Sequence, residues 1–308
     1  MIKFSLLILY AILFSASCVT AEEWPSRTVR IVVPFPPGGG NDIAARILSK
    51  HLSISLKQSV IVENKPGASG TAGTKIYLTT PVDDHTFIIG SSSNIIFSPI
   101  IQKQYNVEDL EPISLLGVGS YLLIANQNTG IRSVGDLIKK AKSHNLTYAS
   151  GGLNTGGHLA MMYFAKLAEI DIKHIIYPGG NPALIALARN EVDLSMLFGW
   201  NLIKQYVEQG IFVPLATTNS IPEKHISHIP PLSLFFPEFE VSLWYGMFGR
   251  KEHSKHILKI LSTKTNEIIS NNLLNEALIN EGLESKNISS EEFKQLIYTE
   301  HMKWKKLL

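Results

Sequence analysis

The stretch IVVPFPPGGGNDIAARIL, residues 31–48, reads as a strand, a glycine loop and a helix. Its β-branched residues predict the strand, and apolar residues spaced three and four apart after Asn41 predict an amphipathic helix. A glycine loop in this position lets main-chain N–H groups approach an anion. The stretch therefore predicts an α/β fold and a site for a negatively charged group.

The same strand–loop–helix order recurs along the chain. Loops rich in Gly, Ser, Thr or Asn follow strands at 34–41, 64–73, 150–157 and 178–181, so each half of the chain supplies two. Strands that alternate with helices predict a parallel sheet covered on both faces, with ligands bound beyond the carboxyl ends of its strands. Loops that face one another across a cleft would hold a carboxylate from both sides.

The order of elements also predicts the domains. The helices expected after residue 255 have no half of their own, so they should pack back on the first half. This gives a leader at 1–21, a discontinuous lobe 1 at 22–120 and 222–308, and an inserted lobe 2 at 121–221. Within lobe 2, Ser133 and Asn181 are expected to cap helices.

The N-terminus predicts export. One positive charge at Lys3 precedes an apolar run and then small residues up to Ala21, which is the layout of a secretory signal peptide. Cleavage after Ala21 would remove Cys18, the only cysteine, and leave a periplasmic protein without thiols. Attachment of a lipid at Cys18 is the alternative, although Ser15 stands where that signal usually has a leucine.

Composition and missing motifs exclude several functions. The 308 residues carry a net charge of +2 with no basic run, which argues against a nucleic-acid partner. The sequence GGGND lacks the Gly-Lys-Ser/Thr of a nucleotide loop, and Lys65 is the one cation in the four loops. No zinc signature or G-x-S-x-G elbow occurs, so neither metal nor cofactor is expected. A small carboxylate is favoured over a phosphate.

Two residues keep an enzyme open as an alternative. Asp42 could act as a general base, although an acid at a helix start more often stabilises the helix dipole. His158 opens a helix behind a glycine loop and could face the cleft, although such a histidine more often caps or packs. A periplasmic hydrolase or transferase using these two residues is one rival, and a ligand-sensing protein for a signalling system is another.

Five segments carry a family resemblance, namely residues 24–48, 60–73, 146–160, 175–194 and 243–246. In this order and spacing, the chain resembles the Bug family, the extracytoplasmic solute receptors of tripartite tricarboxylate transporters. The resemblance implies a type II periplasmic-binding-protein fold, with two α/β lobes and a hinge that closes on an organic acid. It also implies a monomer without turnover that meets membrane transporter subunits transiently.

The resemblance also implies the ligand-binding residues. In lobe 1 these are Phe35, Gly38, Gly39, Asn41, Asp42, Ala68, Ser69, Gly70, Ser91 and Asn94. In lobe 2 they are Ser150, Gly151, Thr155, Gly156, His158, Gly180 and Asn181.

Two departures from the family pattern concern specificity. Asn41 stands where the family often has Thr. Leu197 and Phe198 stand where many members carry an Asp-Asn pair. The far end of the pocket is therefore expected to be apolar and aromatic, and its ligand to be less polar there than citrate or an amino acid.

Overall fold

The computed structural model describes residues 24–220, 224–274, 278–279 and 282–308. The expected leader and Cys18 lie outside these residues. Among the described residues, no helix combines the length and the apolar character needed to cross a bilayer.

The first lobe is built on a six-stranded sheet with the order β11-β4-β10-β3-β1-β2. Its strands are β1 (Val29–Val33), β2 (Val60–Asn64), β3 (Thr86–Ser91), β4 (Leu110–Ser120), β10 (Ser242–Arg250) and β11 (Leu283–Glu284). Its helices are α2 (Gly40–Leu56), α3 (Thr71–Thr79), α4 (Ser98–Gln102), α9 (Lys255–Ser270) and α11 (Ser290–Leu307). The C-terminal helices α9 and α11 both contact β4, as expected from the sequence.

The second lobe is built on a five-stranded sheet with the order β7-β6-β8-β5-β9. Its strands are β5 (Leu122–Asn126), β6 (Leu146–Ser150), β7 (Ile172–Ile176), β8 (Leu194–Leu197) and β9 (Phe212–Thr217). Its helices are α5 (Val134–Ala141), α6 (Gly156–Ala168), α7 (Gly180–Ala188) and α8 (Trp200–Glu208).

Both sheets are mixed, so the expectation of fully parallel sheets is wrong. Strand β1 pairs with β2 and β3 in parallel, and β6 pairs with β7 and β8 in parallel. Strands β10 and β5 run antiparallel to both of their neighbours. Each of these two strands follows a crossing between the lobes, and the direction in which a strand enters its sheet is not encoded in its own residues.

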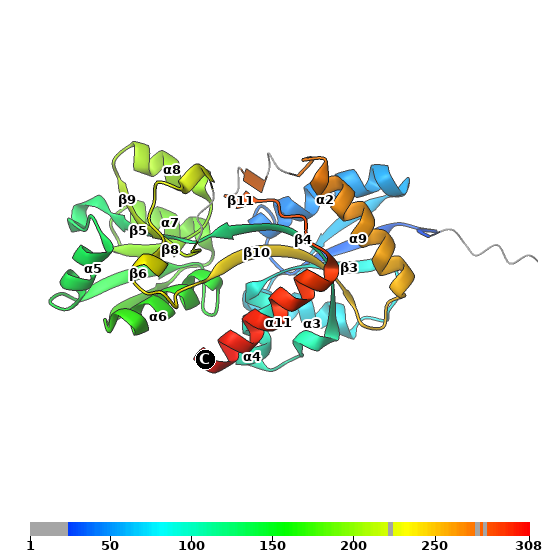
Figure 1. The fold of residues 1–308 in the computed structure, drawn as a ribbon, viewed down its shortest axis with the longest axis horizontal. Helices are drawn as coiled ribbons and strands as arrows, with labels where there is room; N and C mark the ends of the chain where they lie inside the picture. Colours follow the sequence, from blue (N-terminus) through cyan, green and yellow to red (C-terminus); the bar gives the residue numbers. More distant parts are fainter. Residues whose placement is uncertain (1–23, 221–223, 275–277, 280–281) are drawn as a thin grey trace, which may run out of the picture.

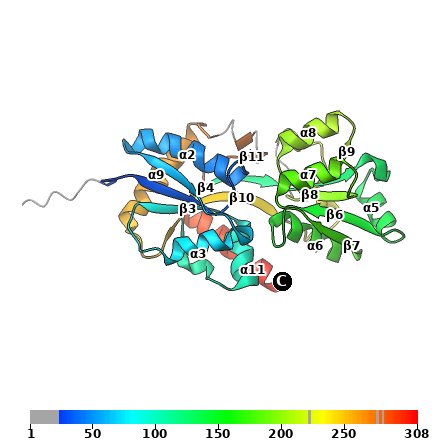
Figure 2. The same cartoon turned by 180° about the vertical axis from the view of Figure 1, so that it is seen from behind.

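Two strands link the lobes. Strand β4 ends at Ser120, and β5 begins at Leu122 in the other sheet, so Tyr121 is the single residue between them. The chain returns through β10, and Figure 1 shows β4 and β10 reaching from the first lobe toward the second. Figure 2 shows the molecule from behind, with β11 at the junction of the lobes.

The segment between β9 and β10 packs on the second lobe in its described part. Ile226 and Ile229 join the second apolar cluster, and the Phe239 ring stacks on Tyr163 of α6 at 5.3 Å between centroids. The sequence had assigned these residues to lobe 1. Ile226 and Ile229 share a cluster with residues of β5, α7 and α8, whereas Phe239 packs on α6, and only the fold brings these elements to the segment.

Two N-caps are predicted for the helices of the second lobe, and the structure confirms the one on α5 but not the one on α7. The Ser133 side chain accepts a hydrogen bond from the Asp136 N–H, as expected for the N-cap of α5. The cap of α7 is Gly179, whose φ of 124° suits glycine, and Asn181 is already inside the helix. The prediction of an Asn181 cap is wrong.

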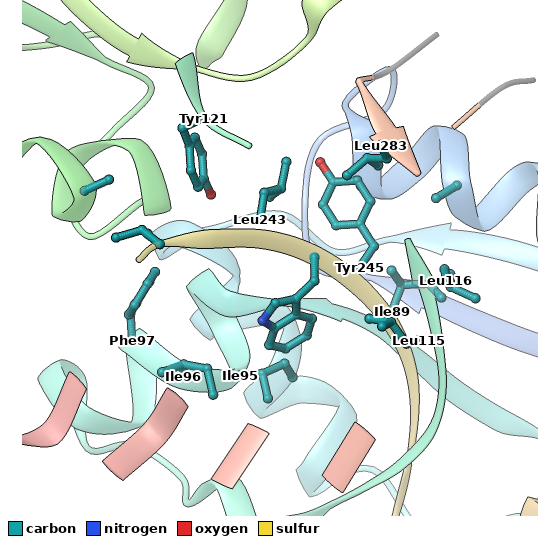
Figure 3. Close-up of a cluster of buried hydrophobic side chains, with 14 of the residues drawn as sticks. Ile89, Ile95, Ile96, Phe97, Leu115, Leu116, Tyr121, Leu243, Tyr245 and Leu283 are labelled. Carbon is teal, nitrogen blue, oxygen red and sulfur yellow. The ribbon is translucent and has the colours of Figure 1, made fainter. Parts of the chain in front are cut away.

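A continuous apolar core runs under the crossing strands. Figure 3 shows Tyr121, Leu243 and Tyr245 on one side of β10, opposite Ile95 and Phe97. Leu243 and Tyr245 share a face because alternate residues of a strand point the same way. This face of β10 lies toward the junction of the lobes.

Candidate ligand-binding site

Asp42 holds the first glycine loop in place. Its Oδ2 accepts hydrogen bonds from the Gly38 N–H and from Arg46 Nε, both at 2.9 Å. Its Oδ1 accepts one from Asn64 Nδ2 at 2.8 Å, and Asn64 Nδ2 also reaches the Phe35 carbonyl at 3.1 Å. The carboxylate thereby joins the loop, the start of α2 and the end of β2.

These bonds decide the charge of Asp42. Burial alone raises the pKa of the carboxyl, but the hydrogen bonds from Arg46, Gly38 and Asn64 outweigh it and hold the pKa below its usual range. Asp42 is only 2% exposed, and both of its oxygens are occupied. It is therefore a loop-positioning residue, and the structure gives no support to a general base here.

Asn41 lies beside Asp42 in the first turn of α2. The residue is 8% exposed, and its Oδ1 has no hydrogen-bond partner among the described residues. Helix α2 begins without a side-chain cap at Gly39. The first turn of a helix carries N–H groups without intrahelical partners, so this end of α2 offers donors.

The second loop of the first lobe has an unusual backbone. Four consecutive residues from Gly67 to Gly70 have positive φ, including 48° at Ala68 and 53° at Ser69. A Cβ on Gly70 would lie 2.8 Å from the Asn94 Cβ and 2.9 Å from the Phe35 ring. The loop is thus pressed against Phe35 and Asn94, and Gly70 is required for that approach.

Asn94 supports this loop from inside the lobe. Its Oδ1 accepts from the Ser91 N–H at 2.9 Å, and its Nδ2 donates to Thr74 Oγ1 at 3.0 Å. The Thr74 hydroxyl donates in turn to the Gly70 carbonyl at 2.8 Å. Asn94 is fully buried and its side chain supports the loop, and its expected contact with a ligand stays a prediction.

The two loops of the second lobe touch each other. A Cβ on Gly151 would meet the Gly179 carbonyl carbon and the Gly180 nitrogen, both at 2.9 Å. Within the first of these loops, the hydroxyls of Ser150 and Thr155 donate to the Gly152 carbonyl at 3.0 and 2.9 Å. Gly180 and Asn181 are exposed, so in this conformation they lie at the rim.

His158 belongs to a stack of three rings. It lies 4.4 Å from His174 between ring centroids, and His174 lies 4.6 Å from Tyr148. The His158 Nδ1 accepts a hydrogen bond from the Asn154 N–H at 3.1 Å. Burial and the neighbouring His174 lower the pKa of His158 to about 4. The neutral His158 ring packs on His174 and accepts a hydrogen bond from the loop, so it supports the loop. With so low a pKa it is a poor acid or base near neutral pH.

Three of the contacts between the lobes lie beside the predicted loops and the starts of α2 and α8. The Ser69 hydroxyl donates to the Leu153 carbonyl at 2.7 Å. A Cβ on Gly40 would lie 3.1 Å from the Phe198 ring of the second lobe. A Cβ on Gly282 would lie 3.1 Å from the Trp200 nitrogen. The loop that contains Ser69 and the loop that follows Ser150 therefore face each other across the junction. Both loops are predicted for the site from the sequence.

Two tyrosines at this junction were missed by sequence reasoning. A Cβ on Gly156 would lie 1.9 Å from the Tyr121 hydroxyl, and one on Gly40 would lie 2.4 Å from the Tyr245 hydroxyl. Each tyrosine therefore touches the first residue of a helix, α6 or α2. Burial raises the pKa of Tyr121, so its hydroxyl stays protonated. The motif LWYG contains Tyr245, but nothing in its pattern indicates that the ring reaches a loop two hundred residues away.

The donor set of the site is neutral. Arg46 pairs with Asp42, and Lys65 lies 3.9 Å from Glu63. In the described part of the chain, no group of three or more His, Cys, Asp or Glu side chains is arranged to hold a metal ion. The site can offer main-chain N–H groups, hydroxyls and amides to a ligand.

Known proteins resemble this chain over most of its length. The model of the tripartite tricarboxylate transporter family receptor matches residues 44–308. The UPF0065 protein in the tcbD-tcbE intergenic region of Pseudomonas sp. (strain P51) is 30% identical over 294 residues, covering 93% of this chain and 87% of that protein. Protein BugT of Bordetella pertussis is 30% identical over 262 residues, covering 82% of this chain and 80% of that protein.

Solved structures share the fold. The structure of R. palustris Rpa4515 with adipate has a TM-score of 0.83 and 27% identity, covering 92% of this chain and 97% of that one. The structure of MatC (Rpa3494) from Rhodopseudomonas palustris with bound malate has a TM-score of 0.82 and 22% identity, covering 92% of this chain and 99% of that one. The expectation of a two-lobed periplasmic-binding-protein fold is confirmed. Because the family model spans residues 44–308, the chain belongs to the tripartite tricarboxylate transporter receptor family.

Proposed function

We propose that the protein is a periplasmic receptor that binds a small carboxylate between its lobes and delivers it to membrane transporter subunits. The observation that carries the proposal is the opposition of glycine loops from the two lobes, joined by the Ser69–Leu153 hydrogen bond. Rpa4515, a structural relative at 27% identity, holds adipate, and MatC holds malate. The protein acts as a monomer, and its contacts with the transporter are transient.

The ligand is held without a fixed positive charge. Arg46 and Lys65 are each engaged with a carboxylate of the same lobe. Helix starts at Gly40 and Gly156 supply N–H groups and a partial positive charge, and the Asn41 amide supplies a side-chain donor. A carboxylate suits this donor set because one or two negative oxygens can be saturated by such groups.

Binding proceeds by hinge closure. The order of elements predicts one rigid body from residues 22–120 and 222–308 and another from residues 121–221, and the contacts of the described residues favour one change to these bounds. Residues 224–239 travel with the second body because Phe239 and Glu238 contact Tyr163 of α6. A ligand that touches both lobes stabilises the closed population by its contacts there.

The protein carries out no turnover. An enzyme based on Asp42 and His158 would need at least one of them free to move a proton. Asp42 accepts three hydrogen bonds through its two oxygens, and His158 Nδ1 accepts one from Asn154. Both residues instead hold the loops that precede or begin α2 and α6.

A thermal-shift screen tests the proposal. Carboxylates of increasing length are compared with the matching primary amides, which have the same shape without the charge. The melting temperature should rise with the concentration of at least one acid and stay unchanged with its amide, because only the folded state binds. If no mono-, di- or tricarboxylate raises the melting temperature, the proposal is wrong. Recovery of the acid unchanged after incubation separates a receptor from an enzyme.

A further inference from the structure

Three aromatic side chains meet at the junction of the lobes, and we call them the aromatic partition. The Phe198 ring lies 6.2 Å from Tyr121 and 6.3 Å from Tyr245 between centroids, edge to face in both cases. Tyr121 is the residue between the two sheets, and Tyr245 lies on β10 of the first. Phe198 comes from the second lobe, directly after β8.

Phe198 reaches across to the first lobe. Its ring would touch a Cβ on Gly40, the first residue of α2, and it packs against the larger apolar cluster, which contains residues of both lobes. Gly199, with φ of 99°, follows it and is the N-cap residue of α8. The tight turn that glycine allows here separates Phe198 from the helix and leaves its ring at the lobe junction.

The partition is far poorer in polar partners than the glycine loops. Leu197 before it is buried, and the two tyrosines are buried along their rings. The three contacts that define the partition, of Phe198 with Gly40, Tyr121 and Tyr245, involve no charged side chain. A ligand carboxylate placed here would lose its hydration without gaining a cation, whereas a hydrocarbon tail would only leave water.

We propose that Phe198 determines specificity, so that the ligand is a monocarboxylate with an apolar tail lying against the aromatic partition. The carboxylate end is held by the glycine loops, and the tail lies against the half-buried Phe198 ring, next to the buried rings of Tyr121 and Tyr245. Dicarboxylates with a charge at the far end are rejected. The inference rests on the proposed function and narrows it to one substrate class.

Hexanoate and adipate test the inference because they share a chain length and differ only in the group at the far end. Calorimetric titration of the full mature chain should give a dissociation constant for hexanoate roughly tenfold or more below that for adipate. The ratio of the adipate dissociation constant to the hexanoate dissociation constant measures this preference. Phe198→Asn should lower the ratio because hexanoate should bind more weakly and adipate more tightly. Phe198→Leu should keep the ratio above one because it stays apolar. Phe235→Asn, at a ring that is exposed outside the junction, serves as the matched control and should leave the ratio unchanged.

The outcomes separate the two proposals. If the natural protein binds adipate as tightly as hexanoate, the inference about Phe198 is overturned while the carboxylate receptor stands. If neither acid nor any other carboxylate binds, the proposed function falls and this inference falls with it. Should Phe198→Asn fail to fold by circular dichroism, the ratio in the natural protein and in Phe198→Leu still decides the question.

Discussion

The Ser69 hydroxyl of the first lobe donates a hydrogen bond to the Leu153 carbonyl of the second, with 2.7 Å between the oxygens. Ser69 belongs to a loop with left-handed backbone, and Leu153 lies in the glycine loop after β6. This bond forms only when the lobes are together, so it acts on closure and not on the stability of either lobe.

Ser69→Ala should weaken ligand binding without unfolding the protein. Loss of one partly exposed hydrogen bond costs about 0.5–1.5 kcal/mol, so the dissociation constant of the bound carboxylate should rise roughly threefold to tenfold. Calorimetric titration measures it, and the melting temperature of the free protein should stay the same. Ser227→Ala, at an exposed hydroxyl bonded to the nearby Lys224 carbonyl, is the control. Equal affinities for Ser69→Ala and the natural protein would contradict the role of this contact.

Asp42→Asn should loosen the first glycine loop. The amide loses the charge that Arg46 faces and presents an N–H toward other donors, which costs about 1–3 kcal/mol of unfolding free energy for a buried group. Because the folded pKa of Asp42 lies below its unfolded value, its stabilisation is present above the unfolded pKa and is lost as pH falls through the folded pKa. Urea unfolding at neutral pH and in acid should therefore show a smaller difference between variant and natural protein in acid. A constant difference would argue against a charged Asp42.

Gly156→Ala should disrupt the start of α6. The new methyl would lie 1.9 Å from the Tyr121 hydroxyl, and the buried ring has little room to move. Overpacking of this kind costs about 1–3 kcal/mol, and the displaced helix start should also weaken carboxylate binding. Gly180→Ala is a close control, since Gly180 also begins a helix and has open space around it. Chemical unfolding of both variants checks the prediction, which fails if the two changes cost the same.

His158 should remain neutral in the folded protein until the pH approaches 4. Its folded pKa is lowered to about 4 from an ordinary 6.5, so the unfolded chain binds the proton first. Lowering the pH from 6.5 to about 4 therefore favours unfolding, by about 2–3 kcal/mol at most for this group. Nuclear magnetic resonance titration of the ring measures the pKa directly. His158→Gln should flatten this part of the stability curve, and a ring that titrates near 6.5 would contradict the prediction.

Glu300 should show the opposite dependence on pH. Trp244 Nε1 donates to its Oε2 at 2.9 Å, and burial raises the pKa of Glu300 to about 7 despite that bond and the nearby Lys303. A carboxyl whose pKa is raised by folding stabilises the folded protein fully below its unfolded pKa near 4.5. This stabilisation is lost as the pH rises toward 7. Glu300→Gln keeps an acceptor for Trp244, so at pH 8 it should be more stable than the natural protein by about 1–3 kcal/mol. Unfolding curves at pH 4.5 and 8 test this, and the gain should vanish at the lower pH.

Most of the local structure could be predicted from short patterns. Strand β1 forms where the β-branched residues predict a strand, and α2 forms where the apolar spacing after Asn41 predicts a helix. Alternating strands and helices with glycine loops between them also led to the two-lobed fold. Such patterns are readable because strand and helix periods are properties of neighbouring residues.

The roles of individual site residues were less accessible. Aspartate, asparagine and histidine are common in binding sites. The side chains of Asp42, Asn94 and His158 nevertheless form hydrogen bonds within the protein that support neighbouring loops. Whether a polar side chain faces a ligand or a loop depends on which donors lie within about 3 Å, and residues far apart in the chain supply those donors. Pattern alone could not distinguish contact from support.

The sequence by itself determined the order of elements, the positions of the glycine loops, the family and the apolar character of Leu197 and Phe198. Tertiary structure alone decided the antiparallel directions of β5 and β10, the Ser69–Leu153 contact and the meeting of Phe198 with Tyr121 and Tyr245. The physical reason is that periodicity and turn chemistry act over a few residues, whereas these contacts join segments that only packing of the two lobes brings together.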